Sequence, residues 1–170
     1  HAALLEAGDP AAAINSLNAY VNPRRPEDKF VTVWVGVLDA EAGTLTYVNA
    51  GHGYALVRRK SGEFEAAAEE GGPPIGIVPD MVFTAGSTTF GAGDRLIVYS
   101  DGLYEQPTGA DAPPGGSRGP VQRFGESGVN GCLRGLGAEE DLVQGLFTAL
   151  EKYAGGTQFE DDTTVVEVRR

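Results

Sequence analysis

The sequence contains little cysteine, histidine and positive charge, and each shortage excludes a class of protein. Cys132 is the only cysteine among 170 residues, so no disulfide can form within the chain. No histidine lies near it in the sequence, and we interpret it as a small apolar residue rather than a nucleophile. With 13 basic and 24 acidic residues the net charge is −11, which repels nucleic acid phosphates and argues against DNA or RNA binding.

Long apolar segments are also missing. No run approaches the ~20 apolar residues that a membrane span needs, and the negative charge disfavours anionic membrane surfaces. The chain shows no secretory signal at its start, and we expect a cytoplasmic protein. Its length suits one domain over residues 1–170, and 25 glycines with 10 prolines indicate many tight turns.

The apolar pattern predicts a mixture of helices and strands. Helices are predicted over residues 2–7, 10–21 and 138–153, and strands over 30–38, 44–49, 55–59, 63–67, 81–90, 95–100 and 163–168. The run 30–38 is apolar on both faces, which predicts a central, buried strand. Residues 106–137 have no lasting period and are predicted to form an irregular flap. Strands that cluster with few crossovers favour an α+β fold, an antiparallel β-sandwich flanked by helices.

Two acidic positions lie at the ends of strongly apolar strands. Asp101 follows the strand predicted over 95–100, and Asp161 precedes the one predicted over 163–168. Apolar strands hold their ends rigidly, so neighbouring strands would let both carboxylates face one ion. Oxygen ligands without histidine or cysteine favour Mg²⁺ or Mn²⁺ over Zn²⁺. Asp-Gly and Asp-Asp are also common turn formers, and spacing alone leaves both interpretations open.

Seven short segments follow one another in the order found in a known enzyme family. They are residues 30–32, 38–43, 47–52, 72–77, 93–105, 124–125 and 161–166. With these segments the chain resembles the PPM protein phosphatases, specifically the bacterial branch named after the sporulation phosphatase SpoIIE. The resemblance spans the chain from Phe30 to its C-terminus.

The resemblance implies a β-sandwich with flanking helices and a centre of two Mn²⁺ or Mg²⁺ ions. Such enzymes hydrolyse phosphoserine or phosphothreonine by a metal-activated water. Asp101 and Asp161 match the family's metal-holding aspartates, and the adjacent Gly102 and Asp162 are candidates for supporting residues or further ligands. Glu105 is typical of the family but has no assigned role. The implied substrate is a phosphoprotein, in bacteria commonly an anti-sigma-factor antagonist of a partner-switching pathway.

One departure from the family is the missing first acidic motif, an aspartate followed by Gly-His-Gly or similar, which bridges the two metals. That motif belongs upstream of a helix like the one predicted over residues 2–7. We therefore expect a phosphatase-like domain that lacks its N-terminal strands and this motif, so the fragment alone can be inactive. The alternative is a non-catalytic pseudophosphatase that binds a signalling partner.

Three other features are set aside as structural. His52 lies between Gly51 and Gly53, which predicts a tight turn rather than an acid–base role. No strand-glycine-helix context supports a phosphate loop in this segment. The basic residues 58–60 are predicted to form a solvated hairpin tip.

Overall fold

The computed structural model describes residues 8–24, 29–68, 71–109, 122–137 and 139–170. The helix predicted over residues 2–7 lies outside this described part. The chain divides into two compact units, one of His1–Leu96 with Arg169–Arg170 and one of Ile97–Val168. Each unit is described by itself.

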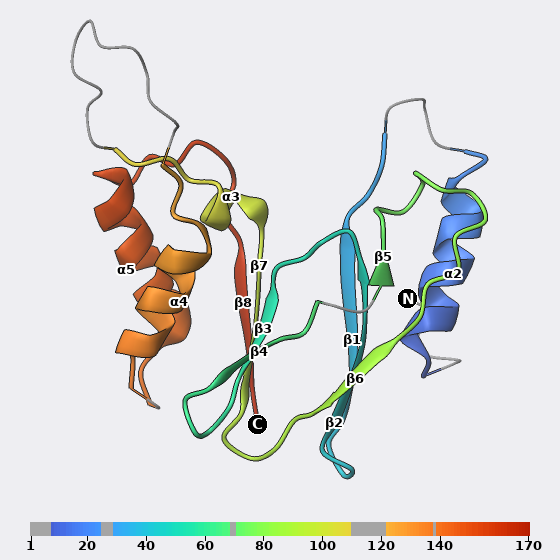
Figure 1. The fold of residues 1–170 in the computed structure, drawn as a ribbon, viewed down its shortest axis with the longest axis horizontal. Coiled ribbons are helices and arrows are strands. Elements are labelled where there is room, and N and C mark those ends of the chain that lie inside the picture. Colours follow the sequence, from blue (N-terminus) through green and yellow to red (C-terminus); the bar gives the residue numbers. More distant parts are fainter. Residues whose placement is uncertain (1–7, 25–28, 69–70, 110–121, 138) are drawn as a thin grey trace, which may run out of the picture. The chain divides into compact units, whose positions relative to one another are not determined.

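Within its described residues the first unit contains one helix and two sets of strands, which can be followed in Figure 1. Its elements are α2 (Pro10–Val21), β1 (Val33–Asp39), β2 (Thr44–Ala50), β3 (Ala55–Arg58), β4 (Phe64–Ala66), β5 (Gly71–Gly72) and β6 (Gly86–Thr89). Strand β2 pairs antiparallel with β1 and β6 and parallel with β5, and β3 pairs antiparallel with β4. The predicted hairpins of residues 30–49 and 55–67 are thereby confirmed.

Helix α2 begins where the sequence predicts it and packs on β2. The Asp9 side chain accepts a hydrogen bond from the backbone N–H of Ala11 at 2.8 Å, which caps the helix start ahead of Pro10. On the inner face Ile14 is buried in a core with four residues of the sheet and its loops. These four are Val48, Ala50, Ile75 and Phe83. The apolar stripe of the helix therefore anchors the first unit.

The prediction of a central, buried strand over residues 30–38 is wrong. Strand β1 begins at Val33 and lies at the end of its sheet, with β2 as its strand partner among the described residues. Phe30 and Val31 precede it and are 57% and 49% exposed. β-branched and aromatic composition favours a strand but does not determine how many neighbours that strand has.

The prediction of a solvated basic tip at residues 58–60 holds for the exposed Lys60 but is wrong for Arg58 and Arg59. Arg58 is buried, and the guanidinium of Arg59 forms ion pairs with Glu65 and Asp94. The Arg59 guanidinium also donates a hydrogen bond to the Thr88 hydroxyl at 2.7 Å. This arginine network connects the β3–β4 hairpin to residues that are distant in sequence, which no local pattern shows.

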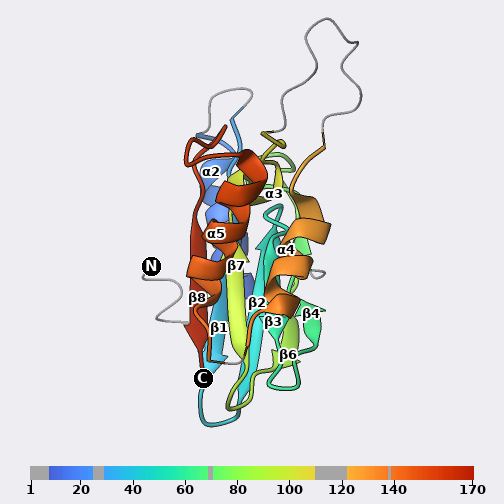
Figure 2. The same cartoon turned by 90° about the vertical axis from the view of Figure 1, so that its left-hand side faces the viewer.

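Among its described residues the second unit contains three helices and most of two adjacent strands, whose residues Arg95, Leu96 and Arg169 belong to the first unit. Its elements are β7 (Arg95–Tyr99), α3 (Asp101–Tyr104), α4 (Gly125–Gly135), α5 (Leu142–Ala154) and β8 (Val165–Arg169). Strands β7 and β8 are neighbours, and Figure 2 shows them side by side with α4 and α5 in front. The helix predicted over 138–153 is confirmed from Leu142 onward as α5, which ends at Gly155 in the left-handed conformation with φ 74°; residues 139–141 precede the helix, and residue 138 lies outside the described part.

Helix α4 contradicts the prediction of an irregular flap over residues 106–137, at least for its described C-terminal part. Four glycines give Gly125–Gly135 a poor intrinsic helix propensity. Val129 and Leu133, four residues apart, are nevertheless fully buried, and α4 packs against α5. Tertiary burial of this narrow apolar stripe outweighs the local preference.

Among the helices of the described residues, none combines the length and the apolar character that crossing a bilayer requires.

Candidate metal centre

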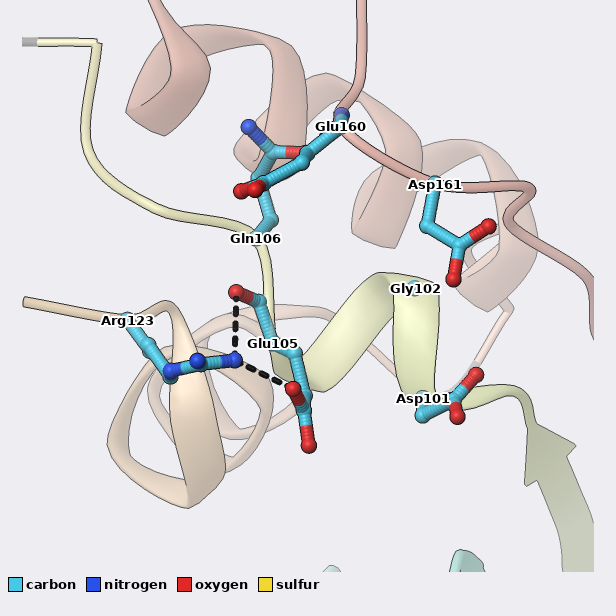
Figure 3. Close-up of a pocket in the computed structure, with 7 residues that line it drawn as sticks. All are labelled: Asp101, Gly102, Glu105, Gln106, Arg123, Glu160 and Asp161. Carbon is cyan, nitrogen blue, oxygen red and sulfur yellow. Dashed lines mark hydrogen bonds and ion pairs between the residues drawn. The ribbon is translucent and has the colours of Figure 1, made fainter.

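A pocket of about 200 Å³ lies in the second unit, around the short helix α3 (Figure 3). The lining comes from α3 and the residues after it, from the segment just before α4 and from the loop before β8. The lining residues are Asp101, Gly102, Glu105, Gln106, Arg123, Glu160 and Asp161. Both aspartates that the sequence singles out therefore border one pocket, although 60 residues separate them in the chain.

Asp101 is positioned by a buried strand and by hydrogen bonds to the neighbouring one. Strand β7 is buried over most of its length, and Ser100 follows it as the residue that precedes α3. The Ser100 backbone N–H donates to the Thr164 carbonyl at 2.9 Å, and its hydroxyl oxygen accepts from the Thr164 N–H at 2.9 Å. These bonds join the end of β7 to the residue before β8, which is the geometry that a shared cation site requires.

Gly102 brings the two acidic segments into direct contact. A Cβ at this position would lie 2.4 Å from the carbonyl oxygen of Asp162 and 3.1 Å from the hydroxyl of Thr163. The same Asp162 carbonyl accepts a hydrogen bond from the Ser100 hydroxyl at 3.2 Å. Only a residue without a side chain allows the backbones to approach this closely. Gly102 and Asp162 thus act here through their backbones.

The carboxylates of Asp101 and Asp161 lie on the same side of the first turn of α3 (Figure 3). Asp161 Oδ1 accepts a hydrogen bond from the backbone N–H of Asp162 at 2.7 Å, which orients that side chain. Both carboxylates are exposed, so an incoming ion can reach them. Asp162 does not line the pocket.

Sequence reasoning missed three polar residues of the pocket: Gln106, Arg123 and Glu160. The buried Gln106 side chain accepts a hydrogen bond from the Glu160 N–H at 3.0 Å and donates one to the Pro107 carbonyl at 3.2 Å. Arg123 forms an ion pair with Glu105, the residue without an assigned role. No motif of chemistry-bearing residues marks these positions, because they come together only through folding.

The donors of this pocket fit a hard divalent cation. Asp101 and Asp161 offer carboxylate oxygens without histidine or thiolate, which is the ligand type that Mg²⁺ and Mn²⁺ prefer. Within the described ranges no group of three or more His, Cys, Asp or Glu side chains is close enough to hold an ion. Two carboxylates still suit Mg²⁺, which binds through one or two of them and keeps several waters.

The remaining candidate side chains have structural surroundings. The Asn49 side chain accepts hydrogen bonds from the backbone N–H groups of His52 (2.8 Å) and Gly53 (3.1 Å), so this segment forms a capped turn. His52 is not among the residues that line the pocket. Burial raises the pKa of the Cys132 thiol, which disfavours the reactive thiolate.

The sequence matches a known protein family over its whole length and curated proteins over part of it. It matches the family described as Stage II sporulation protein E (SpoIIE) over residues 1–170. It is 27% identical over 143 residues to Protein IcfG of Synechocystis, which covers 83% of this chain and 21% of that protein. It is 34% identical over 68 residues to the phosphoserine phosphatase RsbP of Bacillus subtilis, covering 40% of this chain and 17% of RsbP. The chain spans about a fifth of the length of these curated relatives.

Solved structures share the fold. The SiaA-PP2C domain of Pseudomonas aeruginosa superposes with a TM-score of 0.76 at 18% identity, over 99% of this chain and 64% of that one. The manganese-soaked phosphatase domain of SpoIIE from Bacillus subtilis gives a TM-score of 0.64 at 25% identity, over 98% and 68% of the two chains. The predicted α+β fold, with its antiparallel sheets and helices, is therefore confirmed as the PPM phosphatase fold.

Proposed function

Because this chain belongs to the SpoIIE family of PPM-type phosphatase domains, we propose that it hydrolyses phosphoserine or phosphothreonine in a phosphoprotein, with Asp101 and Asp161 as metal ligands. The observation that supports the proposal is the meeting of these two carboxylates in one pocket. Neighbouring strands, the Ser100–Thr164 hydrogen bonds and the close approach at Gly102 hold them there.

In the proposed site, some residues of the pocket bind the metal and others position these ligands. When bound, Mn²⁺ or Mg²⁺ supplies a water of lowered pKa and neutralises charge on the phosphoryl group. Asp101 and Asp161 would hold the cation through their carboxylate oxygens, and a donor set of oxygens alone favours Mg²⁺ or Mn²⁺ over Zn²⁺. Ser100, Gly102 and the backbone of Asp162 keep the two ligands in register. Gln106 fixes the backbone next to Asp161 through its bond to Glu160.

The proposed substrate is a small regulatory phosphoprotein of the anti-sigma-factor antagonist class, acting in a bacterial partner-switching pathway. The match to a phosphoserine phosphatase, RsbP, supports the phosphoserine part of this proposal. We also propose that residues 1–170 act as part of one phosphatase-like domain in the cytoplasm. A second ion, expected from the family, would need ligands beyond Asp101 and Asp161.

The decisive experiment measures phosphate release from a phosphoserine peptide by the full-length protein, with Mn²⁺, with Mg²⁺ and with EDTA. The expected result is Mn²⁺- or Mg²⁺-dependent hydrolysis that Asp101→Asn abolishes, because the amide removes the charge that holds the cation. Asp80→Asn serves as the matched control, since it removes an exposed carboxylate that does not line the pocket.

The pseudophosphatase alternative predicts a different pattern. The full-length protein would then bind a phosphoprotein partner with the same affinity in EDTA as in Mn²⁺, and would release no phosphate from it. That pattern would reject the enzymatic proposal.

A further inference from the structure

We propose that Arg123 binds the phosphoryl oxygens of the substrate, exchanging its ion pair with Glu105 for the phosphate. This inference rests on the proposed function, because it names the group of the same pocket that receives the phosphoryl moiety. The sequence motifs do not mark Arg123, which lies just before α4.

The position of Arg123 is held by a short antiparallel pairing rather than by a free loop. Pro107 and Arg123 form a β-bridge. Around them the Thr108 N–H donates to the Gln122 carbonyl at 3.0 Å, and the Phe124 N–H donates to the Gln106 carbonyl at 2.9 Å. The next residue, Phe124, is buried and packs edge-on against the Tyr153 ring of α5, with 5.4 Å between the ring centroids. The backbone of Arg123 is therefore anchored beside the pocket.

Among the described residues that line the pocket, Arg123 is the one basic side chain, and four carry carboxylates: Asp101, Glu105, Glu160 and Asp161. A phosphate dianion is repelled by that set unless positive charge is present. A cation bound by the two aspartates would neutralise the negative charge on their side of the pocket. Arg123 neutralises the negative charge on the other side, beside Glu105 (Figure 3).

The ion pair between Arg123 and Glu105 is easily exchanged. The two side chains are 51% and 54% exposed, and ion pairs in such contact with solvent contribute little to stability. Both hydrogen bonds to Glu105, to its carboxylate and to its carbonyl, start from Nη1 of the arginine. Among the described residues nothing accepts a hydrogen bond from its Nε or Nη2. The guanidinium therefore retains the planar fork of donors that binds phosphate in bidentate fashion.

The test compares Arg123→Ala, Arg123→Lys and the control Arg134→Ala in the full-length protein. Arg134 is an exposed arginine on α4 that does not line the pocket, so its removal changes the net charge equally. The readouts are KM and kcat for p-nitrophenyl phosphate, and binding of inorganic phosphate by calorimetry in the presence of Mn²⁺. Far-UV circular dichroism checks that each variant is folded.

Arg123→Ala should raise KM and weaken phosphate binding, each by about 10- to 100-fold, as expected for lost hydrogen bonds to a charged group. The lysine variant should recover part of this loss, since it restores charge but not the fork. Arg134→Ala should change neither value. Glu105→Gln should tighten phosphate binding, because it releases Arg123, and this variant decides the question if Arg123→Ala does not fold.

Three outcomes would overturn the assignment. They are unchanged phosphate binding in Arg123→Ala, no phosphate binding by the wild-type protein, and a defect seen with a phosphopeptide but absent with p-nitrophenyl phosphate. The last outcome would mean that Arg123 contacts a residue next to the phosphorylated one in the peptide, and not the phosphoryl group. Arg123-dependent phosphate binding without hydrolysis would support this inference while rejecting the proposed catalytic function.

Discussion

At the scale of single residues, the arrangement of the segments that carry Asp101 and Asp161 depends on contact between their backbones as well as on the two carboxylates. The Asp162 carbonyl lies against the Cα of Gly102 and accepts the Ser100 hydroxyl. A glycine after Asp101 is thus required by close approach, in addition to its usual role in turns. This explains physically why an Asp-Gly pair follows the strand.

Gly102→Ala should destabilise the protein by about 1–3 kcal/mol and weaken Mn²⁺ binding, because the new Cβ displaces the backbone of Asp162. Thermal melts and Mn²⁺ calorimetry measure the two effects. The control is Gly131→Ala in α4, where a Cβ meets nothing within 4 Å and the helix should gain about 0.5–1 kcal/mol. Equal stability of the Gly102 variant and wild type would contradict the close contact.

Asp101→Ala and Asp161→Ala should fold normally and weaken Mn²⁺ binding by more than about tenfold. Mutation of a residue that only hydrogen-bonds to a metal ligand already lowers metal affinity by about that factor. Two carboxylates that line one pocket repel each other without a cation, so removing one costs little stability. Circular dichroism melts in EDTA and calorimetric titration with Mn²⁺ separate folding from binding. Severe unfolding of either variant in metal-free buffer would argue for a structural role instead.

At the scale of elements, the connection from β2 to β3 is organised by one side chain. Asn49 lies in β2, and its amide oxygen accepts from the N–H groups of His52 and Gly53 while its nitrogen donates to the Ala68 carbonyl. His52 packs edge-on against Tyr54 with ring centroids 5.8 Å apart. The glycine-flanked histidine therefore belongs to a capped turn, as its sequence context predicts.

Asn49→Ala should lower stability by about 1–3 kcal/mol, because it leaves partly buried backbone groups without partners. Asn49→Asp keeps the acceptor for both N–H groups and should lose less. Urea denaturation of the two variants gives the comparison. His52→Gln should retain phosphatase activity, and a loss of kcat in that variant would instead assign the histidine to the chemistry.

At the scale of the whole molecule, the chain carries a net charge of −11, and specific carboxylates still contribute to stability. Burial alone would raise the pKa of Asp94, but hydrogen bonds from the Gly91 and Lys60 N–H groups and from Arg59 outweigh it and lower that pKa. The pKa of Glu65 is lowered by the Thr88 hydroxyl and by Arg59.

These lowered pKa values predict acid sensitivity. A group with a lower pKa in the folded state stabilises the protein above its unfolded pKa, about 3.9 for Asp and 4.3 for Glu, and loses this contribution as the pH falls through the folded pKa. The free energy of unfolding should therefore decrease below about pH 4. Denaturant melts from pH 3 to 7 should show that the free energy of unfolding decreases less steeply with falling pH in Asp94→Asn than in the wild type. The same pH dependence in both proteins would reject the role of Asp94.

The sequence by itself determined those features that depend on residues close to one another in the chain. The Asp9–Pro10 helix start, the hairpins, the apolar helix α5 and the two aspartates beside strong strands all follow from short-range patterns. The order of motifs was enough to identify the family, although the contact that requires glycine at position 102 involves Asp162, which is distant in the sequence.

The tertiary structure alone decided which distant residues meet. It paired β7 with β8 and so brought Asp101 to the pocket of Asp161, and it added Arg123, which lies directly before the 124–125 segment but is not itself part of a motif. It also made a helix of glycine-rich α4 and enclosed Arg59 in an ion-pair network. In each case the deciding free energy comes from burial or charge contacts between residues far apart in the chain, which no short window of sequence contains.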